Sequence, residues 1–168
     1  MQSLEFRCRG LLARHYDVLR DGRKVALLDR SVWGEGATIE LEGVDYQMRA
    51  RGFLRSEIDL ARGGEFLVSA VRPSVWSSTF ELRDLHPELA FTGTGEELED
   101  LMLTRSSLWC SSYEINCGRR RIGSMTRTSL WSRGAVLESR EELPLVLAVF
   151  IGSVVISLWA RQAAVAAT

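Results

Sequence analysis

Short stretches of alternating apolar and polar residues run through the first 140 positions of the chain. The clearest pair, residues 16–20 and 24–28, flanks Asp21-Gly22. Such alternation is typical of strands with one buried face, and an Asp-Gly pair readily supplies the positive φ angles of a tight turn. The pattern therefore predicts a β-hairpin here, and it restarts after residues 58 and 113.

Four of the five tryptophans occur in the same tripeptide, Ser-Val-Trp or Ser-Leu-Trp: Trp33, Trp76, Trp109 and Trp131. Three of them end a unit of strand, glycine turn and strand that begins at Tyr16, Ile58 or Tyr113, with spacings of 17, 18 and 18 residues. Regular spacing indicates one supersecondary unit used repeatedly, with chance recurrence of strand residues as the alternative. We expect these four Trp rings to fill core space where strands change direction, with ligand stacking as the alternative.

The only long uncharged stretch is residues 143–160. Its apolar residues point all round a helical wheel, so a helix here must be enclosed by protein or by lipid. Glu141 and Glu142 precede it and Arg161 follows, which complements the helix dipole. We expect a core helix over about 142–162 in which Leu147, Phe150 and Trp159 are buried. At roughly 27 Å the uncharged run is slightly short for a bilayer of ~30 Å, so a tail anchor remains an alternative.

Many short amphipathic strands need something apolar to close around, and an apolar helix can plug a barrel. The predicted fold class is mainly β with one α-helix: a closed antiparallel β-barrel of repeated hairpins surrounding a buried hydrophobic C-terminal helix. We expect a single domain over 1–168, with strands at about 4–140. The pattern leaves residues 84–106 unassigned.

The composition limits the kinds of partner and ligand that the protein is expected to have. With 21 basic and 22 acidic residues the net charge is -1, which disfavours non-specific nucleic-acid binding, so no nucleic acid is expected. Three cysteines and the lack of a signal segment favour a reducing, cytoplasmic compartment. The acidic cluster at 96–100 lacks the spacing of a calcium loop, and two histidines are too few for a zinc site. No metal or cofactor is expected.

The best candidate binding site is basic: Arg119, Arg120 and Arg121 beside Arg127. This patch would meet a lipid headgroup or a phosphate, with a merely solvated surface as the alternative. The sequence has no nucleophile elbow and no phosphate-cradling glycine loop before a helix. We therefore expect a protein that is not an enzyme and has no catalytic residues.

The repeated strand-glycine-strand units, followed by Leu143-Pro144-Leu145 and a hydrophobic C-terminal helix that ends Leu158-Trp159-Ala160-Arg161, resemble the tubby C-terminal-like superfamily. That superfamily includes the LURP-one-related proteins and the phospholipid scramblases. The resemblance covers roughly 16–161 and implies a closed barrel of about twelve strands around one helix. It also implies contact with membrane lipids, through basic surface residues in the tubby proteins.

The leading functional hypothesis is a binding or scaffolding module, cytoplasmic and membrane-associated, whose partners are membrane lipids or a protein. One alternative is a tail-anchored membrane protein with a cytoplasmic β domain. A second is a scramblase-like, lipid-handling activity.

Overall fold

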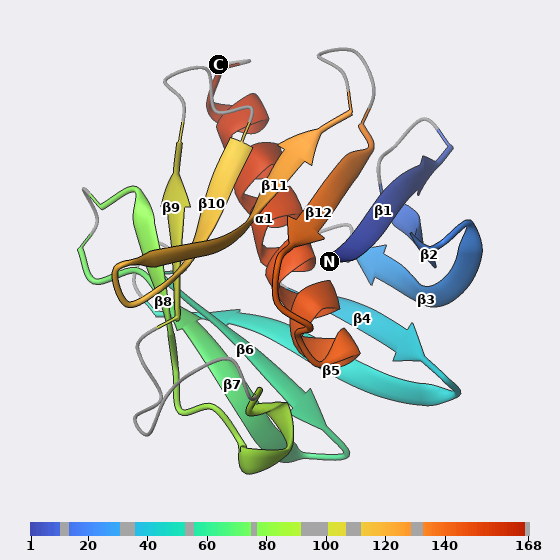
Figure 1. Cartoon of the computed structure of the whole chain (residues 1–168), viewed down its shortest axis with the longest axis horizontal. Coiled ribbons are helices and arrows are strands. Elements are labelled where there is room, and N and C mark those ends of the chain that lie inside the picture. The colour runs from blue at the N-terminus through green and yellow to red at the C-terminus, as the bar shows by residue number, and fades with distance from the viewer. Residues whose placement is uncertain are drawn as a thin grey trace.

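A computed structural model describes residues 1–10, 14–30, 36–52, 56–74, 77–91, 101–106, 112–128 and 133–166, with side chains up to residue 163. The described residues form twelve antiparallel strands in a closed barrel and one helix, α1, inside it (Figure 1). The strands are β1 (Gln2–Arg9), β2 (His15–Arg20), β3 (Arg23–Arg30), β4 (Gly36–Leu41), β5 (Val44–Arg51), β6 (Glu57–Arg62), β7 (Glu65–Val71), β8 (Thr79–Arg83), β9 (Leu101–Arg105), β10 (Ser112–Cys117), β11 (Arg120–Arg127) and β12 (Ala135–Ser139). The predicted fold class is confirmed.

Each strand pairs with its neighbours in sequence, and β1 closes the barrel against β12. The barrel divides into three sectors of four strands, which are β2–β5, β6–β9, and β10–β12 together with β1. The first hairpin of every sector has a register shift at the same place. The shifts lie between Val18 and Leu19, Leu60 and Ala61, and Ile115 and Asn116. The sequence repeat therefore has a counterpart in the strand register.

The helix α1 (Leu145–Ala166) fills the barrel. Leu147 and Phe150 are fully buried, and Trp159 is 5% exposed, so these three predicted core residues are confirmed. The other four predicted core residues lie outside the described residues: Trp33, Trp76, Trp109 and Trp131. The Ser153 hydroxyl donates to the Val149 carbonyl at 2.7 Å, which satisfies a polar group at low cost in a dry interior.

The helix begins three residues later than the sequence predicts. The buried Gln2 side chain holds Leu143 in place, because its amide donates to the Leu143 carbonyl at 3.1 Å and its oxygen accepts from the Leu143 amide at 3.2 Å. Proline disfavours helical geometry in the residue before it, and the Pro144 carbonyl accepts the helical bond from the Ala148 amide at 3.0 Å. The first strand and the start of α1 are thus fixed to each other.

By length and hydropathy alone, Leu145–Ala163 would suit a membrane span, but 72% of an 18-residue stretch of it is buried inside the protein. Core helices of globular proteins meet the same criteria of length and composition. Residues 84–106, which the pattern left unassigned, contain a short 3-10 helix, η2 (Pro87–Leu89), and strand β9.

The helix α1 lies close to the barrel wall at Gly152, where an added Cβ would overlap the Phe6 ring of β1. Alanine normally stabilises a helix interior by about 1 kcal/mol relative to glycine. We expect Gly152→Ala instead to lower the free energy of unfolding by about 1–3 kcal/mol through overpacking. Urea denaturation measures this, and Phe6→Leu in the same chain should recover part of the loss. An unchanged or raised stability for Gly152→Ala would contradict this helix placement.

Removing the helix should abolish the fold. A chain that ends after Glu142 loses the side chains that fill the barrel, each of which contributes about 1.5–3 kcal/mol when large and buried. We expect aggregation and no cooperative thermal transition by circular dichroism. A chain that ends after Ala163 is the matched control and should melt like the full chain. A cooperative melt of the shorter chain would show that α1 is not the core.

Candidate functional site

The two ends of the barrel differ. At the helix-start end, where α1 begins, lie the tight turns between β2 and β3 and between β10 and β11. At the opposite end, which we call the helix-exit end, the ends of β7, β9 and β11 lie beside the last turns of α1. Strand β3, which begins at a tight turn of the helix-start end, also finishes at the helix-exit end. The interior between the two ends is filled by apolar side chains. Sites for ligands are therefore to be sought at the ends and on the outer face.

Every sector has an arginine at the same position of the helix-exit end. In the first hairpin of each sector, a buried residue of the second strand pairs with a residue of the first strand. The pairs are Leu28 with Tyr16, Ala70 with Ile58, and Met125 with Tyr113. The residue two positions later, on the same face of the strand, is an arginine in all three sectors: Arg30, Arg72 and Arg127. Strand alternation thus turns these arginines toward the barrel axis.

These three arginines have different surroundings. Arg127 lies over the Trp159 ring, 4.8 Å from its centroid, in a cation–π contact. Arg30 lies near Tyr16: burial raises the pKa of the Tyr16 phenol, as does Cys8, whereas the positive charges of Arg30 and Arg133 act in the opposite direction. The Arg72 Nε atom is buried and has no hydrogen-bond acceptor among the described residues. An acceptor oxygen from a ligand would complete it.

Arg72 opens onto a cavity of about 270 Å³, the helix-exit pocket. Its lining comes from the ends of β7 to β10 and from α1: Arg72, Ser77, Ser78, Phe80, Arg105, Tyr113, Leu158, Arg161 and Gln162. Three of these described lining residues are arginines and none is acidic. The Gln162 amide donates weakly to the Tyr113 hydroxyl at 3.5 Å, and the Tyr113 ring meets Trp159 edge-on at 6.2 Å. The pocket is a basic recess with an apolar floor.

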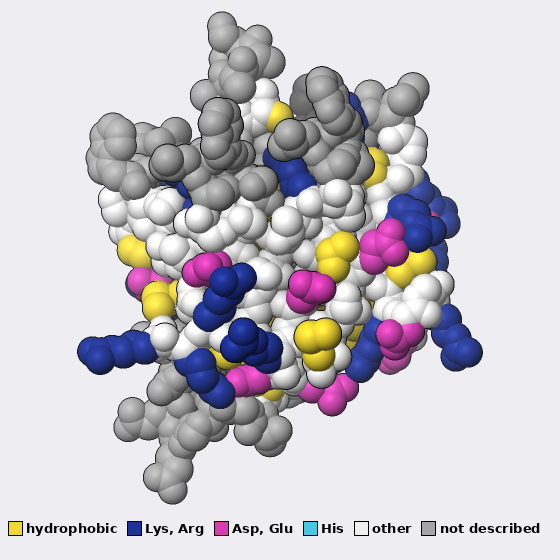
Figure 2. All heavy atoms as spheres, turned by 45° about the horizontal axis from the view of Figure 1, so that its top comes forward, with side chains coloured by type: hydrophobic (Ala, Val, Ile, Leu, Met, Phe, Trp, Pro, Cys, Tyr) yellow, Lys and Arg dark blue, Asp and Glu magenta, His cyan; other side chains and the backbone are white. Residues whose placement is uncertain are grey.

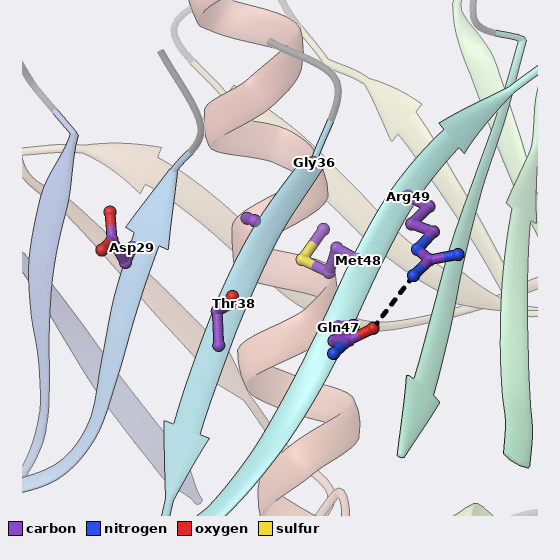
Figure 3. Close-up of a pocket in the computed structure, with 7 residues that line it drawn as sticks. Asp29, Gly36, Thr38, Gln47, Met48 and Arg49 are labelled. Atoms are coloured by element: carbon purple, nitrogen blue, oxygen red, sulfur yellow. Dashed lines mark hydrogen bonds between the residues drawn. The ribbon is translucent and has the colours of Figure 1, made fainter. Parts of the chain in front are cut away.

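A second hollow, of about 470 Å³, lies over β3, β4 and β5. It forms around Gly36, where any Cβ would stand 2.5 Å from the Met48 carbonyl oxygen of the adjacent strand. Figure 3 shows Arg49 beside Gln47, to which it donates at 3.3 Å. Asp29, across the hollow, pairs with His15 at 3.2 Å. The lining of this hollow carries one acidic and one basic side chain, Asp29 and Arg49, whereas the described lining of the helix-exit pocket carries basic side chains alone. The hollow is therefore the weaker candidate for binding an anion.

The structure separates the basic patch predicted from sequence. Arg119, Arg120 and Arg121 lie at the helix-start end, at the turn between β10 and β11. Arg127 lies at the far end of β11, about 23 Å away for seven residues of extended strand. Arg120 pairs with Glu141 at 2.7 Å and Arg121 with Glu114 at 3.0 Å. Only Arg127 of the predicted patch reaches the helix-exit end.

Pairing of this kind is common on the outer surface. Figure 2 shows basic and acidic side chains interspersed over the face it presents. Arg51, for example, pairs with both Glu57 and Asp59 across neighbouring strands. The described lining of the helix-exit pocket, which has three arginines and no carboxylate, differs from this mixed surface.

The sequence prediction missed Arg72, Arg105 and Arg161. A signal for the first two is present, since each Ser-Val-Trp or Ser-Leu-Trp tripeptide has an arginine one or two positions before its serine. These arginines are Arg30, Arg72, Arg105 and Arg127. Their positions relative to the alternating apolar residues would have indicated an inward-facing set. Arg161 has no such signal, because in the sequence it is only the first charged residue after the uncharged run.

Comparisons of the chain with protein-family models, with curated proteins and with solved structures find no match.

The contact of Arg127 with Trp159 can be measured as stability. Arg127→Met keeps the length of the side chain but removes its charge, so we expect a loss of about 0.5–2 kcal/mol in the free energy of unfolding. Arg119→Met, in an exposed turn of the helix-start end, should change it by less than about 0.5 kcal/mol. Urea denaturation of both variants gives the comparison. Equal effects of the two substitutions would argue against a specific contact.

Proposed function

We propose that this protein is a non-enzymatic binding module that holds an anionic group, of the kind carried by lipid headgroups, in the helix-exit pocket. The observation that carries the proposal is the convergence of Arg72, Arg105 and Arg161 on one recess whose described lining contains no carboxylate. The three side chains come from two strand ends and a helix, which a run of basic residues in sequence could not provide.

Guanidinium groups suit this role. Arginine stays charged at any physiological pH and presents its donors as a planar fork that matches phosphate and carboxylate oxygens. The buried Arg72 Nε has no hydrogen-bond acceptor among the described residues. Hydrogen bonds to charged groups contribute about 1.5–3 kcal/mol, more than neutral ones. A bound anion would therefore gain most from Arg72 and its two neighbours.

The filled interior supports a site at the end of the barrel. A wide β-barrel often holds its ligand in the lumen, but here α1 occupies that space with fully buried side chains such as Leu147 and Phe150. A tail-anchored arrangement would require the same side chains to leave the barrel. The described structure therefore supports a module in which α1 forms the core and the rim of the barrel binds the ligand.

The resemblance to the tubby C-terminal-like superfamily also favours lipid headgroups as the source of the anion. The resemblance stays a prediction, and it contributes no site residues, because the arginines of the helix-exit pocket come from the geometry alone. A scramblase-like activity stays an alternative that rests on the resemblance.

Binding to vesicles tests the proposal. We expect the full chain to sediment with phosphatidylcholine vesicles that contain phosphatidylserine or phosphatidic acid, and not with phosphatidylcholine alone. Arg72→Gln combined with Arg161→Gln should weaken that binding by about tenfold or more, since two charge-assisted contacts are lost. The matched control, Arg119→Gln with Arg121→Gln, removes the same charge from the helix-start end and should change binding by less than about twofold.

Two results would contradict the proposal. One is an equal loss in both double variants, which would reflect net charge alone. The other is a full chain that binds none of the anionic vesicles.

A further inference from the structure

Buried polar side-chain atoms that lack a hydrogen-bond partner gather at one end of the barrel. Within the part of the chain that the structure describes, these atoms belong to Asp17, Arg72, Glu141, Trp159 and Gln162. The Asp17 carboxylate has an ion-pair partner in Lys24, at 3.1 Å. The Glu141 carboxylate has one in Arg120, at 2.7 Å. The remaining atoms are Arg72 Nε, Trp159 Nε1 and Gln162 Oε1, and all three belong to the helix-exit end.

Arg72 differs from the two arginines that share its position in the repeat. Arg127 lies over the Trp159 ring, and Arg30 has an interaction within the chain. The Arg72 Nε donor, in contrast, is buried without an acceptor among the described residues. The backbone amide of Arg72 donates to the Ser56 carbonyl at 2.8 Å, which fixes the strand end from which the side chain extends. Arg72 is thus held in place with a donor that an outside acceptor would satisfy.

Gln162 presents the opposite kind of unsatisfied atom. Its amide nitrogen donates to the Tyr113 hydroxyl at 3.5 Å, which leaves its oxygen as an acceptor. That oxygen is buried and has no donor among the described residues. The nearby Ser77 hydroxyl is already engaged, because it donates to the Thr79 carbonyl at 3.3 Å and accepts from the Thr79 amide at 3.0 Å. Gln162 therefore requires a donor from a ligand.

Both unsatisfied atoms belong to residues that line the helix-exit pocket, a cavity of about 270 Å³. Leu158 lies one helical turn before Gln162, on the same face of α1. Leu158 and Phe80 line the pocket as well, and both are buried. A ligand that fits this lining has an acceptor for Arg72, a donor for Gln162 and a short carbon link that packs on the apolar floor.

The donor that suits Gln162 is an uncharged one. An ammonium group would bring a second positive charge close to Arg72, in a recess whose described lining has no carboxylate. A hydroxyl group donates a hydrogen bond without a charge. The lining therefore favours a hydroxyl over an amine at this place.

We infer that the helix-exit pocket takes a hydroxyl-bearing phosphate ester, of which the phosphoglycerol group is the simplest form. A phosphate oxygen accepts from Arg72 Nε, and a hydroxyl of the same ligand donates to Gln162 Oε1. This inference rests on the proposed function, which supplies the anion, and it adds the hydroxyl and the residue that recognises it. A phosphoglycerol group occurs both in lipid headgroups and in soluble glycerol phosphate.

Vesicles of phosphatidylcholine with equal fractions of phosphatidylglycerol or phosphatidylpropanol test the inference. The two anionic headgroups have the same charge and the same number of carbons, and they differ only in their hydroxyl groups. We expect the full chain to bind phosphatidylglycerol about threefold to tenfold more tightly, which is the effect of one additional hydrogen bond.

Gln162→Met keeps most of the side-chain length but removes the acceptor. We expect this variant to melt like the full chain and to bind both lipids equally, with the affinity of the full chain for phosphatidylpropanol. Gln47→Met, at an exposed position of β5, is the matched control and should keep the preference. Gln162→Ala provides a second variant if the methionine chain is unstable.

Calorimetric titration with glycerol phosphate and with propyl phosphate distinguishes the two sources of the ligand. A soluble source predicts a preference for glycerol phosphate in solution and no preference between the two lipids. A lipid source predicts the preference on vesicles and weak binding of both soluble esters.

The failures are separable from those of the proposed function. If the full chain binds anionic vesicles but shows no preference for the hydroxylated compound in either format, or if Gln162→Met keeps that preference, the inference fails and the anion site stands. Tighter binding of the propyl compounds would also overturn it, because Gln162 would then direct its amide nitrogen into the pocket. If the full chain binds neither anionic vesicles nor phosphate esters, both fail.

Discussion

The enclosure of α1 by the barrel is the constraint on which the rest of this structure depends. The helix is apolar all round and cannot face water, while a closed barrel of twelve strands is too wide for its own side chains to fill. Each element therefore supplies the apolar surface that the other needs. The amide clamp between Gln2 and Leu143 and the contact of Phe6 with Gly152 fix the helix at its start and middle. Residues that bind a ligand are therefore expected at the ends of the barrel or on its outer face.

The same constraint explains why arginines gather at one end. Strand alternation continues past the apolar part of the core, so the last inward positions meet the polar end of α1 at Arg161 and Gln162. Arginine suits such positions, because its stem packs on apolar surface while its head reaches water. At the helix-start end the exposed arginines Arg120 and Arg121 of β11 pair with Glu141 and Glu114 instead. Position along a strand, more than local sequence, decides at which end of the barrel an arginine lies.

Much of the fold could be predicted from the sequence, since its signals are local. Alternation and glycine turns indicate hairpins, a fixed spacing indicates repetition, and an uncharged run of 18 residues indicates an enclosed helix. The candidate site is not local, because Arg72, Arg105 and Arg161 are separated by more than thirty positions each and meet only through barrel closure. For the predicted basic patch, closeness in sequence was misleading. Arg119 to Arg121 are neighbours in sequence and share an end, but an extended strand carries Arg127 to the other end.

A repeated architecture also separates what the fold requires from what a site requires. The arginine shared by all sectors, Arg72 with Arg30 and Arg127, is compatible with a purely structural role at the rim, and the Trp159 contact of Arg127 is one example. A residue found in one sector alone is not required by the shared fold when its counterparts are small, as Ala50 and Cys8 are for Arg105, and Ala37 and Ala135 for Phe80. Arg105 and Phe80 both meet this condition, and both line the one recess in which a buried guanidinium nitrogen lacks an acceptor among the described residues. Two departures from the repeat and one donor that is unsatisfied among the described residues therefore coincide at the helix-exit pocket, and this is why we propose the pocket, rather than the rim as a whole, as the binding site.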